Sequence, residues 1–153
     1  MSITLKFYPK IKPKLTKITP IIKKDSQLDI ISDNHFWLTG EFHNNNDLGF
    51  LFTDEGSLAF TMSDLKEGYI DLTNALLRQI GYTCFVGITV KVFFDTEQDL
   101  GTASKKVSEF SSKLKKWFKV SGFKYGLNNN KEQVVTYVEF ELELENDCYL
   151  DKE

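Results

Sequence analysis

Residues 134–145 read VVTYVEFELELE and, from Val138 onward, alternate strictly between apolar and acidic side chains. Successive side chains of a β-strand point to opposite faces of the sheet. One face would therefore carry Val138, Phe140, Leu142 and Leu144, and the other Glu139, Glu141, Glu143 and Glu145. This pattern predicts a half-buried strand with an acidic outer face, and the other elements are expected to be arranged around it.

The four glutamates would form a row about 20 Å long, at roughly 3.4 Å per residue. Like charges on neighbouring positions repel, so such a row lowers stability unless positive charge lies nearby. Asp147 follows the row, and Asp54 and Glu55 fall at a predicted hairpin tip. We predict that these residues bind a basic partner: Glu139, Glu141, Glu143, Glu145, Asp147, Asp54 and Glu55. An acidic solvent face, or one paired with the protein's own lysines, is the alternative.

Six further stretches have the alternation or apolar character of strands, at residues 2–8, 35–43, 48–53, 57–62, 83–94 and 123–127. The three strands between residues 35 and 62 are predicted to form an antiparallel meander, with a hairpin turn at Asp54, Glu55 and Gly56. The stretch 83–94 is apolar on both faces, which predicts a strand at the centre of its sheet.

Two helices are predicted, at residues 64–80 and 97–119. Ser63 and Thr96 are the expected N-caps, and Gly81 and Gly122 the expected stops. The longer helix carries an apolar stripe that should pack on the sheet, made of Leu100, Val107, Phe110, Leu114 and Trp117. The prediction is a single α+β domain over residues 1–153, with a mostly antiparallel sheet, one long amphipathic helix and a shorter helix packed on it.

Charge is segregated along the 153 residues, although the net charge is only −3. Residues 1–24 hold seven lysines and no acid, whereas residues 25–95 and the tail from 128 onward are acidic. Arg78 is the only arginine. Lysine binds phosphate as a point charge and lacks the planar fork that reads guanine, so sequence-specific DNA recognition is disfavoured.

The two cysteines, Cys84 and Cys148, have neither Cys-x-x-Cys spacing nor histidine companions at metal-binding distance in the sequence. Cys84 lies in an apolar run, so we expect a buried free thiol rather than a redox group. No signal-peptide pattern and no apolar run of transmembrane length is seen. A soluble cytoplasmic protein without a membrane partner is the expectation.

Catalytic and cofactor motifs are missing from the sequence: there is no Gly-x-Gly-x-x-Gly, no phosphate-binding loop and no Gly-x-Ser-x-Gly. His35, Glu41 and His43 would share one face of a regular strand. The two histidines are eight positions apart, too far for one ion. Glu41 and His43 could meet, but two exposed polar residues on a strand do so routinely. We therefore expect no enzymatic activity, no cofactor and no metal.

Nucleic-acid binding or a regulatory role is the alternative function. Lys10, Lys12 and Lys14 lie in the N-terminal arm, and the 97–119 helix is also rich in lysine, so both could follow a phosphate backbone. Most aromatic residues fall on predicted core faces, however, and the acidic blocks would repel nucleic acid. Nucleic acid is thus not the expected partner.

The general plan of the chain resembles the small immunity proteins of bacterial contact-dependent growth inhibition systems. The resemblance rests on an opening strand that runs into Lys-Phe-Tyr-Pro-Lys-Ile-Lys-Pro at 6–13, on the meander, and on the final acidic strand 138–145. Members of that group bind and neutralise a cognate toxin domain, often a nuclease, without catalysis. The resemblance implies a basic toxin domain as partner; it carries over no functional residue and leaves the oligomeric state open.

Overall fold

The structure is a computed structural model, and it describes residues 1–10, 28–32, 35–38, 48–52, 57–125 and 134–150. Its elements in chain order are β1 (Ser2–Pro9), β2 (Leu28–Ser32), β3 (His35–Leu38), β4 (Leu48–Phe52), β5 (Leu58–Met62), α1 (Glu67–Gln79), β6 (Phe85–Asp99), α2 (Leu100–Phe118), β7 (Val120–Tyr125) and β8 (Val134–Leu144). Within these residues, no helix has the length and apolar character needed to cross a membrane.

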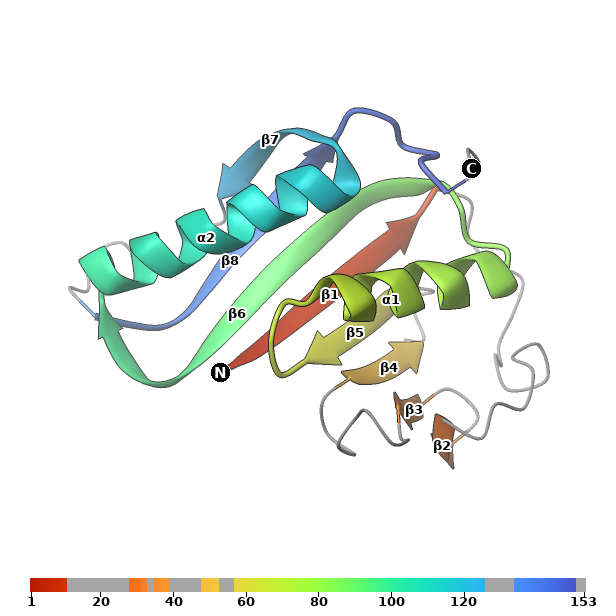
Figure 1. The fold of residues 1–153 in the computed structure, drawn as a ribbon, viewed down its shortest axis with the longest axis horizontal. Coiled ribbons are helices and arrows are strands. Elements are labelled where there is room, and N and C mark those ends of the chain that lie inside the picture. Colours follow the sequence, from red (N-terminus) through yellow and green to blue (C-terminus); the bar gives the residue numbers. More distant parts are fainter. Residues whose placement is uncertain (11–27, 33–34, 39–47, 53–56, 126–133, 151–153) are drawn as a thin grey trace.

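All the described strands belong to one antiparallel sheet in the order β2-β3-β4-β5-β1-β6-β8-β7 (Figure 1). The predicted α+β class with an antiparallel sheet and two helices is confirmed. The meander prediction is also confirmed, since β3, β4 and β5 pair in sequence. β6 lies between β1 and β8, in the central position that its apolar run predicted.

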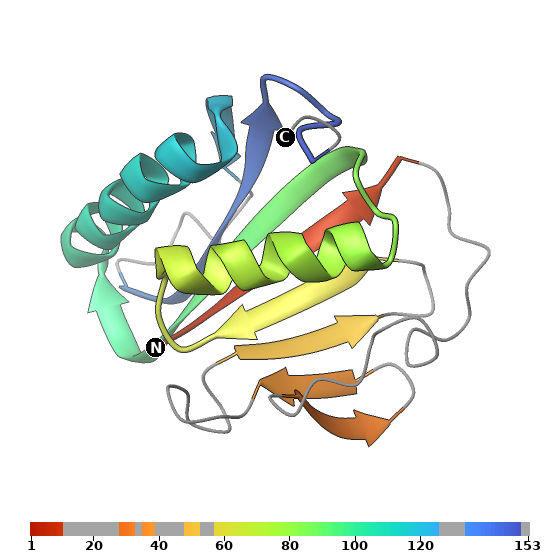
Figure 2. The ribbon, with the colours of Figure 1, turned by 45° about the vertical axis from the view of Figure 1, so that its right-hand side comes forward.

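Both helices lie on the same face of the sheet, as two views of the ribbon show (Figures 1 and 2). The strand register explains the core beneath them. Leu5 is opposite Phe60 on one side and Val90 on the other, and Val90 is opposite Phe140. These side chains point to one face and are all buried. An apolar layer of aligned strand residues thus faces the two helices.

The long helix α2 buries most of its predicted stripe. Val107, Phe110 and Leu114 are buried, and Trp117 packs partly buried against the core. Leu100 is an error of the prediction, because it stands at the first helical position and is 47% exposed. At that end, the helix has only begun to pass over the sheet.

Both predicted ends of α2 were wrong. The N-cap is Asp99 rather than Thr96, and its carboxylate accepts a hydrogen bond of 2.7 Å from the Thr102 N–H, which lowers the pKa of Asp99. The helix ends at Phe118 because Lys119 adopts a left-handed backbone conformation with φ of 50°. Gly122 does not stop the helix and instead lies inside β7.

In α1 the predicted stop is confirmed, because Gly81 has φ of 81° and follows the C-cap residue Ile80. Positive φ is a conformation that glycine adopts without a steric penalty. The predicted start is wrong: the N-cap is Lys66, which makes no side-chain capping bond, and Ser63 precedes the helix.

The expected free thiol of Cys84 is also wrong, since Cys84 forms a disulfide with Cys148 across 64 residues of sequence. The β6–β8 register provides the physical reason. Ile88 is opposite Leu142, and antiparallel strands run in opposite directions, so the residues just before Ile88 meet those just after Leu142. Nothing local to either cysteine indicates this pairing.

Replacing Leu114 by alanine should lower the free energy of unfolding by about 2–5 kcal/mol, because the side chain is fully buried and its removal leaves a cavity. Leu100→Ala is the matched control, since the same atoms are removed from a half-exposed site. Urea denaturation of both variants provides the measurement. Equal losses in the two variants would contradict the packing of α2 described above.

Stability should also fall as the pH rises above about 10. Burial raises the pKa of Tyr82 to about 12 and also raises the pKa of Tyr149, opposed in the latter by Arg78. Unfolded tyrosines ionise near pH 10, so above that pH the unfolded state binds fewer protons than the folded state and unfolding becomes easier. Urea titrations at pH 8, 10 and 11 measure this fall, which Tyr149→Phe should reduce.

Candidate partner-binding face of the sheet

The face of the sheet opposite the helices carries the acidic row, and none of the described elements covers it (Figure 2). We call it the open face. The register aligns on it residues from five strands: Thr61, Thr4, Lys6, Thr89, Lys91, Phe93, Tyr137, Glu139, Glu141, Glu143 and Lys124. All of them are half-exposed or exposed, in contrast to the buried layer beneath the helices.

Three of the predicted glutamates lie together on this face. Phe140 and Leu142 are buried on the helix side, whereas Glu141 and Glu143 are exposed and Glu139 is half-exposed. The predicted alternation of β8 is therefore confirmed. β8 is not an edge strand, because β6 and β7 flank it, so the row lies within the sheet surface.

Two lysines stand opposite the row in the register: Lys91 faces Glu139 from β6, and Lys124 faces Glu141 from β7. The strand register thus places two of the protein's own lysines opposite the acidic row, which is the position that the alternative interpretation requires. Within the described part of the chain, however, no ammonium or guanidinium group lies within 4.0 Å of the carboxylates of Glu139, Glu141 or Glu143. The carboxylates remain available to an external cation.

Glycines on the neighbouring strands make room for two of the carboxylates. A Cβ atom on Gly87 would lie 2.9 Å from Oε1 of Glu141, and one on Gly122 would lie 3.2 Å from Oε2 of Glu143. Each glutamate side chain therefore lies across the backbone of the adjacent strand. Gly122 was predicted to stop the helix, and in the structure it instead leaves space for the Glu143 carboxylate.

A cation–aromatic group that sequence analysis missed lies beside the row. The Lys91 ammonium is 5.0 Å from the ring centroid of Phe93 and 4.5 Å from that of Tyr137, and the two centroids are 5.9 Å apart. The rings are 39% and 37% exposed. The sequence analysis assigned most aromatic residues to the core. The only signal in the sequence against that assignment was Lys91, a lysine within an apolar strand. The Lys91 ammonium is held over the rings rather than over Glu139.

The other predicted binding residues lie beyond the strand register that aligns this row. Glu145 is exposed and follows the end of β8, where its N–H donates to the Lys119 carbonyl at 3.1 Å. The Asp147 carboxylate lies 3.8 Å from the Lys10 ammonium, an exposed ion pair of little energetic weight. Asp54 and Glu55 lie outside the described residues. The strand register therefore aligns Glu139, Glu141 and Glu143 on one surface.

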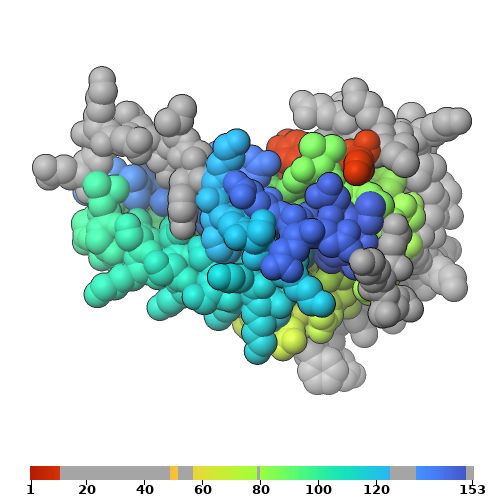
Figure 3. Space-filling model, turned by 90° about the horizontal axis from the view of Figure 1, so that it is seen from above, coloured from red at the N-terminus to blue at the C-terminus, as the bar shows by residue number. Residues whose placement is uncertain are grey.

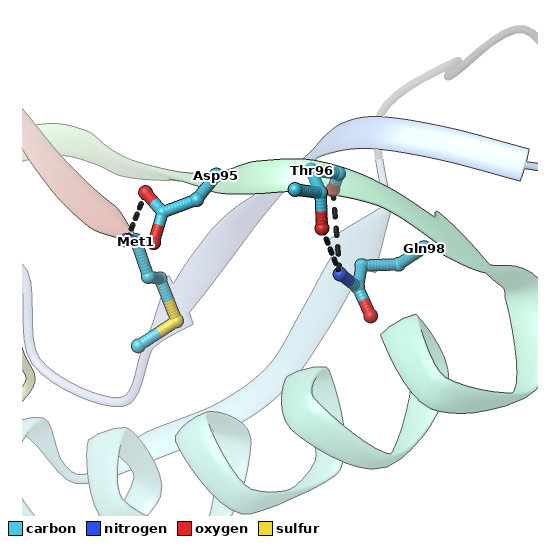
Figure 4. Close-up of polar contacts among 4 residues, drawn as sticks. All are labelled: Met1, Asp95, Thr96 and Gln98. Carbon is cyan, nitrogen blue, oxygen red and sulfur yellow. Dashed lines mark hydrogen bonds and ion pairs between the residues drawn. The ribbon is translucent and has the colours of Figure 1, made fainter.

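At the border of the open face, the pairing of β6 with β8 is interrupted between Phe93 and Gln98. There the Gln98 side chain donates to the carbonyl and hydroxyl oxygens of Thr96, and the amino group of Met1 forms an ion pair with Asp95 (Figure 4). Thr96, the predicted helix cap, instead accepts hydrogen bonds within the strand.

Most of the candidate histidine site of the sequence analysis lies outside the described residues. His35 begins β3, but Glu41 and His43 lie outside the described residues. Among the residues that the structure describes, no group of three or more histidine, cysteine, aspartate or glutamate side chains could hold a metal ion. The expected absence of metal, cofactor and catalysis stays a prediction.

Comparisons with protein-family models, with curated proteins and with solved structures give no match to this chain.

The residues opposite the glutamates predict different effects of neutralising them on stability. Glu139→Gln should lower the free energy of unfolding by about 0.2 kcal/mol, the low end of the range for facing opposite charges, because Glu139 faces Lys91 across the strands but the Lys91 ammonium lies over the aromatic rings. Glu143→Gln should leave it unchanged or raise it slightly, because Glu143 faces Gly122 and loses only repulsion from Glu141.

Urea denaturation at low and at 1 M salt measures both variants, and salt should reduce the difference between them. A larger loss for Glu143→Gln than for Glu139→Gln would contradict this electrostatic account of the open face.

Proposed function

We propose that this chain is a non-enzymatic binding protein that docks a basic protein surface onto the open face of its sheet. The observation that carries the proposal is the row of Glu139, Glu141 and Glu143 on an uncovered face, with no described cation within ion-pair distance of the carboxylates. Charges fixed on one rigid strand accelerate the encounter with an oppositely charged partner and fix its orientation.

The partner that we propose is a toxin domain, and the sequence resemblance to immunity proteins of contact-dependent growth inhibition systems supports this choice. A nuclease is the preferred toxin, because its substrate groove must be basic to hold phosphates. Carboxylates at alternate strand positions are about 7 Å apart and would occupy such a groove in place of the phosphates. Binding there would block access of the nucleic acid to the active site.

The Lys91 group adds a second kind of contact to the proposed interface. Half-exposed aromatic rings next to charged residues are typical of the central anchors of protein interfaces. Phe93 and Tyr137 would supply apolar contact, while the glutamates provide charge complementarity. The two contributions differ in their kinetics: apolar anchors mainly slow dissociation, and charges mainly accelerate association.

A nucleic-acid-binding role remains the second candidate, and the outer surface of α2 favours it. Lys105, Lys113 and Lys116 are exposed there, on the helix layer rather than on the open face. The acidic row therefore does not oppose phosphate binding at α2 directly. A salt-dependent mobility shift with duplex DNA or RNA, lost in a Lys105→Gln/Lys113→Gln/Lys116→Gln variant, would support this candidate.

The sequence predicted a cytoplasmic location, and the Cys84–Cys148 disulfide argues against it. Cytosolic thiols are kept reduced, whereas disulfides persist in oxidising compartments such as the bacterial periplasm. An oxidising compartment is compatible with both the Cys84–Cys148 bond and the capture of an incoming toxin.

The proposal predicts the binding kinetics of the Glu139→Gln/Glu141→Gln/Glu143→Gln variant. Its association rate with a cognate toxin domain, sought among the products of the genes that neighbour this chain's gene, should fall at least tenfold at low salt, and the dependence of that rate on salt should flatten. Surface plasmon resonance at several salt concentrations measures both quantities.

The matched control is Glu67→Gln/Asp71→Asn/Glu109→Gln, which removes the same charge from exposed positions on the helices. It should keep most of the wild-type association rate and its salt dependence. Equal effects of the two triple variants would show that net charge determines the association rate, and they would contradict the role proposed for the acidic row. The absence of any binding by the wild-type protein to the toxin domain would refute the proposed partner.

A further inference from the structure

The C-terminal segment, residues 146–150, folds back from β8 and closes one end of the core. The Tyr149 ring centroid lies 5.9 Å from that of Phe85 in β6 and 5.7 Å from that of Phe118 in α2. Its hydroxyl donates to Oδ1 of Asn74 in α1 at 3.1 Å, and Leu150 is only 3% exposed. The segment thus contacts the central strand and both helices.

Figure 3 shows the end of the chain, in dark blue, lying against the C-terminal end of α2 and β7, in teal to light blue. Through Tyr149, residues 146–150 contact β6, α2 and α1.

Few interactions other than packing hold the segment in place. The Phe85 N–H donates to the Asp147 carbonyl at 2.9 Å, and the Lys10–Asp147 ion pair is exposed and weak. The Cys148 N–H bonds to Oδ1 of Asn146, which lies within the segment itself. The segment continues from β8 through the backbone, and the disulfide to Cys84 is a second covalent attachment to the core.

The energetic balance of docking is close without that covalent link. Ordering the backbone of a short terminal segment costs free energy of the same size as that gained by burying one tyrosine and one leucine. The disulfide lowers this ordering cost, because it keeps residue 148 beside Cys84 in every conformation of the segment. Its reduction therefore shifts the balance toward release of the segment.

Both cysteines are partly exposed, which distinguishes them from inert buried thiols. Thiol–disulfide exchange requires a thiolate to reach one of the two sulfur atoms, and neither cysteine of this pair is fully buried. Cys84 directly precedes β6, and Cys148 lies in the C-terminal segment, so cleavage separates two parts of the chain that are far apart in sequence.

We propose that the Cys84–Cys148 pair is a redox modification site at which a dithiol reductant releases residues 146–150 from the core. One thiolate of the reductant attacks a sulfur atom of the bond and forms a mixed disulfide, and its second thiol then displaces that cysteine. The reductant ends as its own disulfide, and Cys84 and Cys148 end as two thiols after transfer of two electrons and two protons. A disulfide oxidant reverses the step.

Release uncovers apolar surface on Phe85 and Phe118 and frees the Phe85 N–H from the Asp147 carbonyl. The strands of the sheet keep their own pairing, because none of the β1, β5 and β6 register contacts involves residues 146–150. Reduction is therefore a local opening rather than global unfolding. The inference rests on the disulfide and its surroundings, and it does not depend on the proposed function.

Amide hydrogen exchange of the full chain, before and after treatment with dithiothreitol, tests the inference. We expect the Phe85 amide to exchange at least tenfold faster after reduction, while the amides of Leu5 and Phe60 stay equally protected. Burial holds the pKa of Tyr149 above its ordinary value in the oxidised protein. An ultraviolet titration should therefore gain one tyrosine that ionises near pH 10 once the bond is reduced.

The Cys84→Ser/Cys148→Ser variant is the control for side effects of the reductant. It should show the fast exchange at Phe85 without dithiothreitol and no further change with it. Incorporation of two alkyl groups by the unreduced protein on treatment with iodoacetamide would overturn the inference, because the bond would not exist. Unchanged exchange at Phe85 after reduction would also overturn it.

An equal acceleration at Leu5, Phe60 and Phe85 would likewise overturn the inference, because the disulfide would then stabilise the whole fold rather than hold one segment. Toxin binding does not enter any of these measurements. Their outcome is therefore independent of whether the proposed function holds.

Discussion

The pairing register of β6 with β8 is the constraint on which the rest of this structure depends. With Val90 opposite Phe140, the apolar residues of both strands face the helices and the glutamates face outward. A slip of one residue would turn every side chain of β8 to the other face and bury a row of carboxylates. Burying an unpaired carboxylate is so unfavourable that the alternation fixes the register. The same register places Lys91 opposite Glu139 and Cys84 beside the C-terminal segment.

The order of the strands explains why one face of the sheet is left open. β5 and β6 are both antiparallel to β1, and β6 and β7 are both antiparallel to β8, so α1 and α2 each connect two parallel strands across an intervening one. Both connections move in the same direction along the sheet. Connections of the same hand that move in one direction place their helices on the same face, as observed, and such crossovers are nearly always right-handed. The topology thus places both described helices on one face and none of them on the other.

Patterns within single stretches of the sequence predicted those features of the fold that depend on neighbouring residues alone. The period-two alternation located β8 and its acidic side, and the helical spacing of Val107, Phe110 and Leu114 located the buried side of α2. The misses depend on residues far apart in sequence. Asp99 rather than Thr96 caps α2 because β6 continues to pair with β8 as far as Asp99 opposite Val134. The Cys84–Cys148 bond and the Lys91 group likewise require the strand register, which no single stretch contains.

Folding of this chain requires the apolar layer beneath the helices, but it places little demand on the charge of the outer residues. Glu139, Glu141 and Glu143 repel one another, and the lysine that faces Glu139 holds its ammonium over Phe93 and Tyr137 instead. Glycines at 87 and 122 leave space for two of the carboxylates to lie flat across neighbouring strands. The acidic row thus adds little to the stability of the isolated chain, while the surrounding backbone accommodates it. Under the proposed function, the complement of these charges is a basic protein surface.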